Sequence, residues 1–221
     1  MEIIENPNNR FRPTAGDAFG DSWTIMWKHF PTLLVVSILY MVITGVTGFG
    51  QWQADTFRWF MAPMALFAFL YGIFIAGPIS YSVNWLYLKA IRGDEYEIRD
   101  MFAVFNKNYW NAVGANVVVS IIIGIGILFF IIPGIVLACR LAFVSYLVMD
   151  RDMELSQAIE MSWKMTRGYG VHIFLMGILA TLVVLLGFIA FFVGILIAVV
   201  WIQAAFATMY QAVVEEEGYF Q

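Results

Sequence analysis

The chain has 221 residues, of which 62% are hydrophobic and 13% are charged, and its formal net charge is −4. Because such a small share of charged side chains cannot cover this much apolar surface in water, the composition excludes a soluble globular protein. We expect an integral membrane protein. The modest charge and the lack of a basic patch argue against a nucleic-acid partner. The single cysteine, Cys139, leaves no intrachain disulfide to form.

Six membrane-spanning helices fit the apolar stretches of the sequence. A hydrocarbon core of about 30 Å requires roughly 20 helical residues, and these stretches are too long and too uniformly apolar for barrel strands. The predicted spans are Pro31 to Phe49, Phe67 to Leu88, Asn111 to Ile131, Gly134 to Met149, and two more within Val171 to Tyr210. The polar N-terminal segment is not followed by a cleavable apolar core, so the sequence predicts no signal peptide.

Proline and glycine mark the expected ends and bends of these helices. Pro63 and Pro78 predict kinks or breaks near the second span, and Ile132-Pro133-Gly134 separates the third span from the fourth. The last apolar block would be about 60 Å long as a single helix, twice the thickness of the bilayer core. We therefore expect it to fold back between Gly187 and Gly194.

Lysines and arginines gather on one side of the predicted spans. Ten of them precede the first span, lie between the second and third spans, or lie between the fourth and fifth spans. They are Arg10, Arg12, Lys28, Lys89, Arg92, Arg99, Lys107, Arg151, Lys164 and Arg167. Arg58 alone lies on the opposite side of the predicted spans. This positive-inside bias predicts that the N- and C-termini both face the cytoplasm.

Large apolar residues recur at helical spacing in the three basic segments. The sets are Phe19, Trp23, Met26 and Phe30; Ile98, Met101, Phe102, Phe105 and Tyr109; and Leu155, Ile159 and Trp163. Each set predicts an amphipathic helix at the cytoplasmic interface of the membrane. Two roles are open: an aromatic belt packed against the span ends, or recruitment of a protein partner or of lipid head groups.

An internal repeat is the next prediction. Asp21 to Leu39 aligns without gaps to Met161 to Leu179, with a shared Ser-Trp near the start and Ile-Leu at the end, and Met101 to Val119 follows the same apolar pattern. A single membrane domain over residues 1–221 would then contain three parallel units, 16–92, 98–150 and 155–214. Each unit would be an interfacial helix, a span out and a span back. Chance similarity between apolar helices is the other explanation.

Three longer segments occur in an order found in a known family. They are "AGPISYSVNWLYLKAIRGDEYEIRDMFAVFNKNYW", "IIPGIVLACRLAFVSYLVMDRDMELSQAIEMSWKMTRGYG" and "GILIAVVWIQAAFATMYQAVV". The most informative signature is Ile132-Pro133-Gly134, an apolar helix ending in Asp150, then Ala158 and Ser162-Trp163. The chain resembles the domain of unknown function numbered 975, a family of prokaryotic multipass proteins. That family is similar to YciC-type proteins and to the membrane domain of some glycerophosphodiester phosphodiesterases. The resemblance implies the prokaryotic plasma membrane and names no reaction.

Reactive side chains are few, so we expect neither an enzyme nor a site for a cofactor or metal. His29 and His172 lie at predicted helix starts, without an HExxH, CxxC or paired-carboxylate pattern. No serine lies in the Gly-x-Ser-x-Gly turn that exposes a nucleophile. Every acidic residue except Asp55 falls in a predicted cytoplasmic segment, so we expect no carboxylate at the bilayer midplane to couple ion transport.

Arg140 is a charged residue within an apolar span. It lies six residues past Gly134, or about 9 Å along a helix, where an unpaired guanidinium costs several kcal/mol. Its candidate partners are carbonyls freed at Pro133, the hydroxyls of Tyr81, Ser120 and Thr181, and the amides of Asn84, Asn116 and Gln203. Asn84 and Gln203 lie in the returning spans of the other two predicted units. We therefore hypothesise that Asn84, Arg140 and Gln203 converge on a central axis.

Two roles are open for Arg140. In the first, its side chain hydrogen-bonds neighbouring helices and fixes their register. In the second, its bidentate guanidinium binds an external anion such as a lipid phosphate or an anionic metabolite. The sequence predicts a non-enzymatic accessory or scaffold protein that binds membrane lipids or a protein partner. The alternative is a transporter of small molecules or lipids with a polar cavity around Arg140.

Overall fold

The computed structural model describes residues 11–45, 58–189 and 191–219, and every regular element within these ranges is helical. The elements are α1 (Ala15–Lys28), α2 (Phe30–Gly45), α3 (Arg58–Tyr71), the π-helix η2 (Gly72–Ala76), α4 (Gly77–Arg92), the 3-10 helix η3 (Ile98–Phe105), α5 (Tyr109–Phe129), α6 (Ile131–Arg140), α7 (Val144–Asp150), α8 (Leu155–Met165), α9 (Gly170–Ile189) and α10 (Phe191–Glu216). The described part of the chain is thus all-α, as the sequence predicts.

Five helical stretches are long and apolar enough to cross a membrane. They are Ala65–Arg92, which runs from α3 through η2 into α4, and Tyr109–Phe129, Ile131–Asp150, Gly170–Ile189 and Gly194–Glu216. A sixth crossing requires α1 and α2 together, and these two helices meet at a bend of 100°. The first predicted span is therefore a helix only over α2. The predicted end of that span near Phe49 lies outside the described residues. Arg10 and Asp55, which entered the predicted orientation and the count of acidic residues, lie outside them as well.

The predicted breaks are partly wrong. Helix α3 continues through Pro63, and its irregular continuation is the π-helix η2 directly before α4, where Pro78 occupies the first turn. The turn between α5 and α6 lies at Phe130, whose backbone is extended. Ile132-Pro133-Gly134 instead forms the start of α6, because a proline there loses no helical hydrogen bond. The fold-back predicted between Gly187 and Gly194 is confirmed, since α9 ends at Ile189 and α10 begins at Phe191.

The core forms where α4, α7 and α10 meet. Tyr87, Tyr146 and Tyr210, one from each of these helices, are almost fully buried there. Tyr146 and Tyr210 stack with their ring centroids 5.0 Å apart. The hydroxyl of Tyr87 hydrogen-bonds that of Ser37 at 2.6 Å, which joins α2 to the same core.

The three predicted amphipathic helices are α1, η3 and α8, and each packs against another helix. Helix α1 lies against α10, where the indole N–H of Trp201 donates to the carbonyl of Phe19 at 2.9 Å. Helix η3 lies against α4, where the Val104 N–H donates to the Ser82 hydroxyl oxygen at 2.8 Å. Helix α8 lies against α7. Large side chains on the other faces are exposed, among them Trp23, Phe102 and Trp163.

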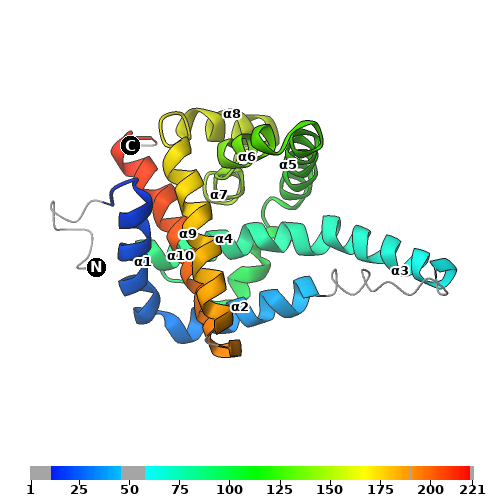
Figure 1. Cartoon of the computed structure of the whole chain (residues 1–221), viewed down its shortest axis with the longest axis horizontal. Helices are drawn as coiled ribbons and strands as arrows, with labels where there is room; N and C mark the ends of the chain where they lie inside the picture. Colours follow the sequence, from blue (N-terminus) through cyan, green and yellow to red (C-terminus); the bar gives the residue numbers. More distant parts are fainter. Residues whose placement is uncertain (1–10, 46–57, 190, 220–221) are drawn as a thin grey trace.

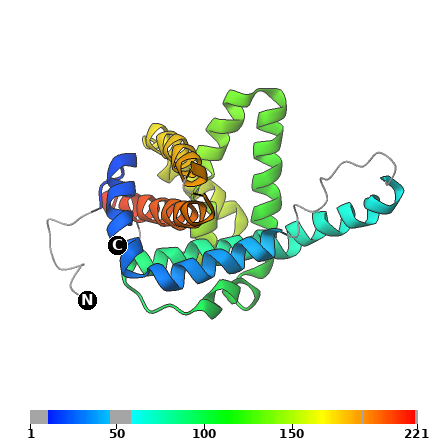
Figure 2. The same cartoon turned by 60° about the horizontal axis from the view of Figure 1, so that its bottom comes forward.

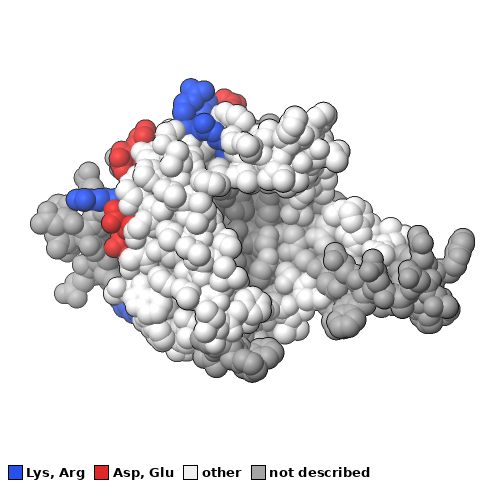
Figure 3. Space-filling view, in the orientation of Figure 1, with Lys and Arg blue, Asp and Glu red and all other residues white. Residues whose placement is uncertain are grey.

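Parts of the structure project from this core. Figure 1 shows α3 and the α5–α6 pair leaving the core, and Figure 2 shows that they point in different directions. The tip of the α5–α6 pair exposes large apolar side chains: Leu128 is 84% exposed and Phe130 74%. Figure 3 shows charged residues along one border of the visible face. Within α5 and α6, Arg140 at the end of α6 is the one charged residue. Exposed apolar surface of this extent is compatible with a lipid surrounding.

Candidate functional site

Arg140 is the last residue of α6, at an interruption of the candidate span Ile131–Asp150. The chain turns over Leu141–Phe143 before α7 begins. The Ser162 hydroxyl of α8 donates to the Arg140 carbonyl at 2.8 Å, and its oxygen accepts the N–H of Phe143 at 3.3 Å. Thr166 donates to the same carbonyl at 3.3 Å. Helix α8 thereby hydrogen-bonds backbone groups that have no intrahelical partner at the end of α6 and the start of α7, and it holds the interruption in place.

The guanidinium of Arg140 lies over an aromatic ring, and no ion pair joins it to an acidic group within the described ranges. Its Cζ lies 5.7 Å from the centroid of the Trp163 ring, a cation–π contact. Its Nη1 atom is buried and has no hydrogen-bond partner among the described residues. A buried donor without an acceptor costs about 1–3 kcal/mol, and more when it is charged. An anion that accepts a hydrogen bond from Nη1 would remove that cost.

A groove of about 370 Å³ lies beside Arg140, between α6 and α9. Its walls include Ile132, Ile135, Val136, Val171 and Phe174. Arg140 is the one charged residue among those that line it. Figure 3 shows the visible face hollowed between α9 and the α5–α6 pair. The site therefore combines an elongated apolar wall with a single guanidinium.

The three predicted site residues make separate contacts. The amide of Asn84 donates to the hydroxyl of Ser145 at 3.0 Å, which ties α4 to α7. Gln203 lies half-buried on α10. Within the described ranges, no hydrogen bond joins Asn84, Arg140 and Gln203 to one another, and their convergence stays a hypothesis. The contact of Arg140 with α8 was missed because nothing in the sequence marks the interruption at Leu141–Phe143.

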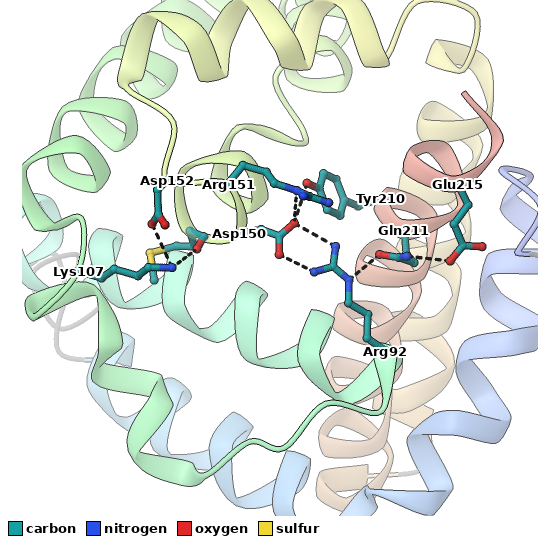
Figure 4. A network of polar contacts seen from close by, with 9 residues as sticks. Arg92, Lys107, Asp150, Arg151, Asp152, Tyr210, Gln211 and Glu215 are labelled. Carbon is teal, nitrogen blue, oxygen red and sulfur yellow. Dashed lines mark hydrogen bonds and ion pairs between the residues drawn. The ribbon is translucent and has the colours of Figure 1, made fainter. Parts of the chain in front are cut away.

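A second set of polar residues joins the ends of α4, α7 and α10 (Figure 4). The two terminal nitrogens of Arg92 donate to the two carboxylate oxygens of Asp150 at 2.5 and 3.0 Å, and the Arg92 Nε donates to Gln211 at 2.7 Å. Asp150 also accepts from the hydroxyl of Tyr210 at 3.2 Å and pairs with Arg151 at 3.1 Å. Only 6% of the Asp150 side chain is exposed. Asp150 is thus the common acceptor of a nearly buried network.

Neighbouring contacts extend this network to the start of α5. Lys107 pairs with Asp152 at 3.0 Å, and the Asn108 amide donates to Asp152 at 2.8 Å and to the carbonyl of Val148 at 3.1 Å. Asp152 has a positive φ of 52°, a conformation that a short polar side chain tolerates. In the sequence, Arg92 and Lys107 indicated orientation only, and Asp150 was part of a signature without a role. The sequence reasoning therefore missed the network.

Neither histidine is among the residues that line the α6–α9 groove or bond in the Asp150 network. The ring of His29, between α1 and α2, packs edge-on against Tyr96 at 5.6 Å. Burial, and next the charge of Lys28, lowers the pKa of His29, so its neutral form is favoured. His172 lies in the first turn of α9. Among the described residues, no group of three or more His, Cys, Asp or Glu side chains is arranged to hold a metal ion.

Comparison with models of known protein families, with curated proteins and with solved structures finds no match to this chain. Over its described residues the chain is all-α, with five helices long and apolar enough to cross a membrane, or six if α1 and α2 form one crossing.

Proposed function

We propose that this chain is a non-enzymatic multipass membrane protein that binds an anionic lipid, with the lipid phosphate at Arg140 and an acyl chain along the α6–α9 groove. The observation that carries the proposal is the buried Nη1 of Arg140, which has no acceptor among the described residues and lies beside an apolar wall. Phosphate oxygens match the bidentate fork of a guanidinium. An acyl chain matches Ile132, Val136, Val171 and Phe174.

A lipid fits this groove better than a small polar solute does. The walls beside Arg140 are mostly aliphatic and aromatic, with the thiol of Cys139 the other polar side chain among the lining residues. A transporter of soluble metabolites would need further polar groups to replace the water around its substrate. We therefore favour a binding or accessory role over the transport alternative.

We infer that both termini face the cytoplasm of a prokaryotic cell, because the positive-inside bias of the sequence favours that orientation. Helices α1, η3 and α8 would then lie at the cytoplasmic interface. Their exposed Trp23, Phe102 and Trp163 support this placement, since aromatic side chains are enriched where apolar and polar surroundings meet.

A threefold repeat is supported by how the short helices pack. In the proposed units, η3 begins the second and packs on α4, the last helix of the first. Helix α8 begins the third and packs on α7, the last helix of the second. Helix α1 begins the first and packs on α10, the last helix of the third. Each proposed unit would thus start against the last helix of another unit, as a cyclic threefold repeat predicts.

Native mass spectrometry of the purified protein tests the lipid proposal. Arg140→Gln removes the guanidinium charge, and Arg167→Gln is the control, because Arg167 is an exposed arginine just after α8. We expect an anionic lipid bound to the wild type and to Arg167→Gln, and lost from Arg140→Gln at equal folding yield. A wild type that carries no lipid, even after addition of phosphatidylglycerol, would contradict the proposal.

A further inference from the structure

A second groove, larger than the α6–α9 groove, lies against α5. It has a volume of about 800 Å³ and is bounded by α2, α5 and the helix that runs from α3 through η2 into α4. This volume is in the range of small-molecule sites. Its walls are apolar at Ala68, Phe69 and Val117, and none of its lining residues is charged. The polar groups in it are hydroxyls and one amide, from Tyr40, Ser80, Asn116 and Ser120 among others.

Asn116 is the polar residue of greatest interest in this groove. It lies on α5, within a candidate membrane span of mean hydropathy 2.4. Its amide makes no hydrogen bond to any described residue. By contrast, the amide of Asn84 on the neighbouring α4 donates to the hydroxyl of Ser145. A polar side chain inside a membrane span is costly unless it has partners, and it commonly marks a ligand site.

The backbone opposite Asn116 is irregular in a way that fits such a site. Residues Gly72–Ala76 form the π-helix η2, and Gly72, Ile73 and Ala76 line the groove. Single π-turns inside long helices occur frequently at functional sites. At Gly77 an added Cβ would overlap the amide nitrogen of Asn116, so a glycine is required to seat that amide against the helix.

We propose that this groove binds the head group of an uncharged lipid that carries a free hydroxyl, such as a diacylglycerol. A hydroxyl both donates and accepts, so it can satisfy the carbonyl and the NH2 of Asn116 and reach Ser120. The groove offers no cation to neutralise a phosphate, which disfavours the anionic lipid proposed for the α6–α9 groove. The apolar walls would hold the start of the acyl chains.

The test uses two lipids with identical chains, dioleoylglycerol and dioleoyl phosphatidic acid, added separately to the full-length protein before native mass spectrometry. Asn116→Leu removes the amide and nearly preserves the volume. We expect Asn116→Leu to bind dioleoylglycerol about tenfold more weakly, the equivalent of losing one or two hydrogen bonds, and to bind phosphatidic acid as the wild type does. Arg140→Gln should show the opposite pattern.

Two results would overturn the inference: a wild type that does not retain dioleoylglycerol, or an Asn116→Leu variant that retains it fully. Ser120→Ala guards against a folding defect in Asn116→Leu, because Ser120 is exposed on α5 and its removal should leave packing intact. It should weaken dioleoylglycerol binding a few-fold. Unchanged binding by both variants would equally contradict the site. Since each groove has its own lipid and its own variant, failure of one proposal is distinguishable from failure of the other.

Discussion

Arg92 and Asp150 form a bidentate ion pair that joins the end of α4 to the end of α7. The Asp150 carboxylate is nearly buried, and Gln211 and Tyr210 bind the pair from α10. Three helices that are distant in sequence therefore end on one carboxylate. Breaking such a pair by removing one partner is costly, because the remaining charge stays away from water.

Asp150→Asn should lower the stability of the fold markedly. The amide cannot neutralise Arg92, whose side chain is only 21% exposed, so we expect a loss of about 3 kcal/mol. Thermal unfolding in detergent, followed with a dye that reacts with Cys139 as it becomes accessible, would measure the loss.

The matched control is Arg99→Gln, which breaks the ion pair of Arg99 with Glu97. Both side chains of that pair are mostly exposed, at 80% and 63%, so the change should be under about 1 kcal/mol. Equal effects of the two substitutions would show that the Asp150 network contributes no more than a surface pair.

Ser162→Ala should loosen the interruption between α6 and α7. The substitution removes the acceptor of the buried Phe143 N–H and one of the two donors to the part-buried Arg140 carbonyl, which retains Thr166. Hydrogen exchange at the amides of residues 141–144 should speed up by about tenfold or more, the equivalent of 1–3 kcal/mol. Ser156→Ala, at an exposed position of the same helix, should leave exchange there unchanged. Unaltered exchange in Ser162→Ala would remove the bracing role given to α8.

Gly134→Ala should disturb the contact between α5 and α6. An added Cβ would lie 2.7 Å from the backbone nitrogen of Ile127, which cannot move without bending α5. Overpacking of this kind costs about 1–3 kcal/mol. Gly124→Ala adds the same methyl group to α5 where nothing lies within 4 Å, so it should be neutral or slightly stabilising. Equal melting temperatures for Gly134→Ala and the wild type would contradict the close packing of the pair.

The sequence predicts local features of this fold well and tertiary ones poorly. Hydropathy locates α5, α9 and α10 to within a few residues, because a helix in lipid must be apolar over its whole length. Large apolar residues at helical spacing locate α1 and η3, because the buried face of a short helix repeats along its own sequence. Proline misleads at the α5–α6 turn, since it starts a helix as readily as it ends one.

The contacts that define the candidate sites depend on long-range packing. Arg92 and Asp150 lie 58 residues apart, and no periodicity links them. The interruption at Leu141–Phe143 contains neither proline nor glycine, so no local pattern indicates that α8 lies beside Arg140. The partners predicted for Arg140 did not include Trp163 of α8, whereas Arg140 as a charged residue in an apolar span was visible from the sequence alone.

Photo-cross-linking tests the central claim most directly. The protein would be reconstituted in vesicles with a phosphatidic acid analogue that carries a diazirine in one acyl chain, and the labelled peptides would be mapped by mass spectrometry. We expect labels concentrated on Ile132, Val136, Val171 and Phe174, and a several-fold loss of this labelling in Arg140→Gln but not in Arg167→Gln. Labels spread evenly over the exposed apolar residues of α5, α6 and α9, with no dependence on Arg140, would contradict the claim.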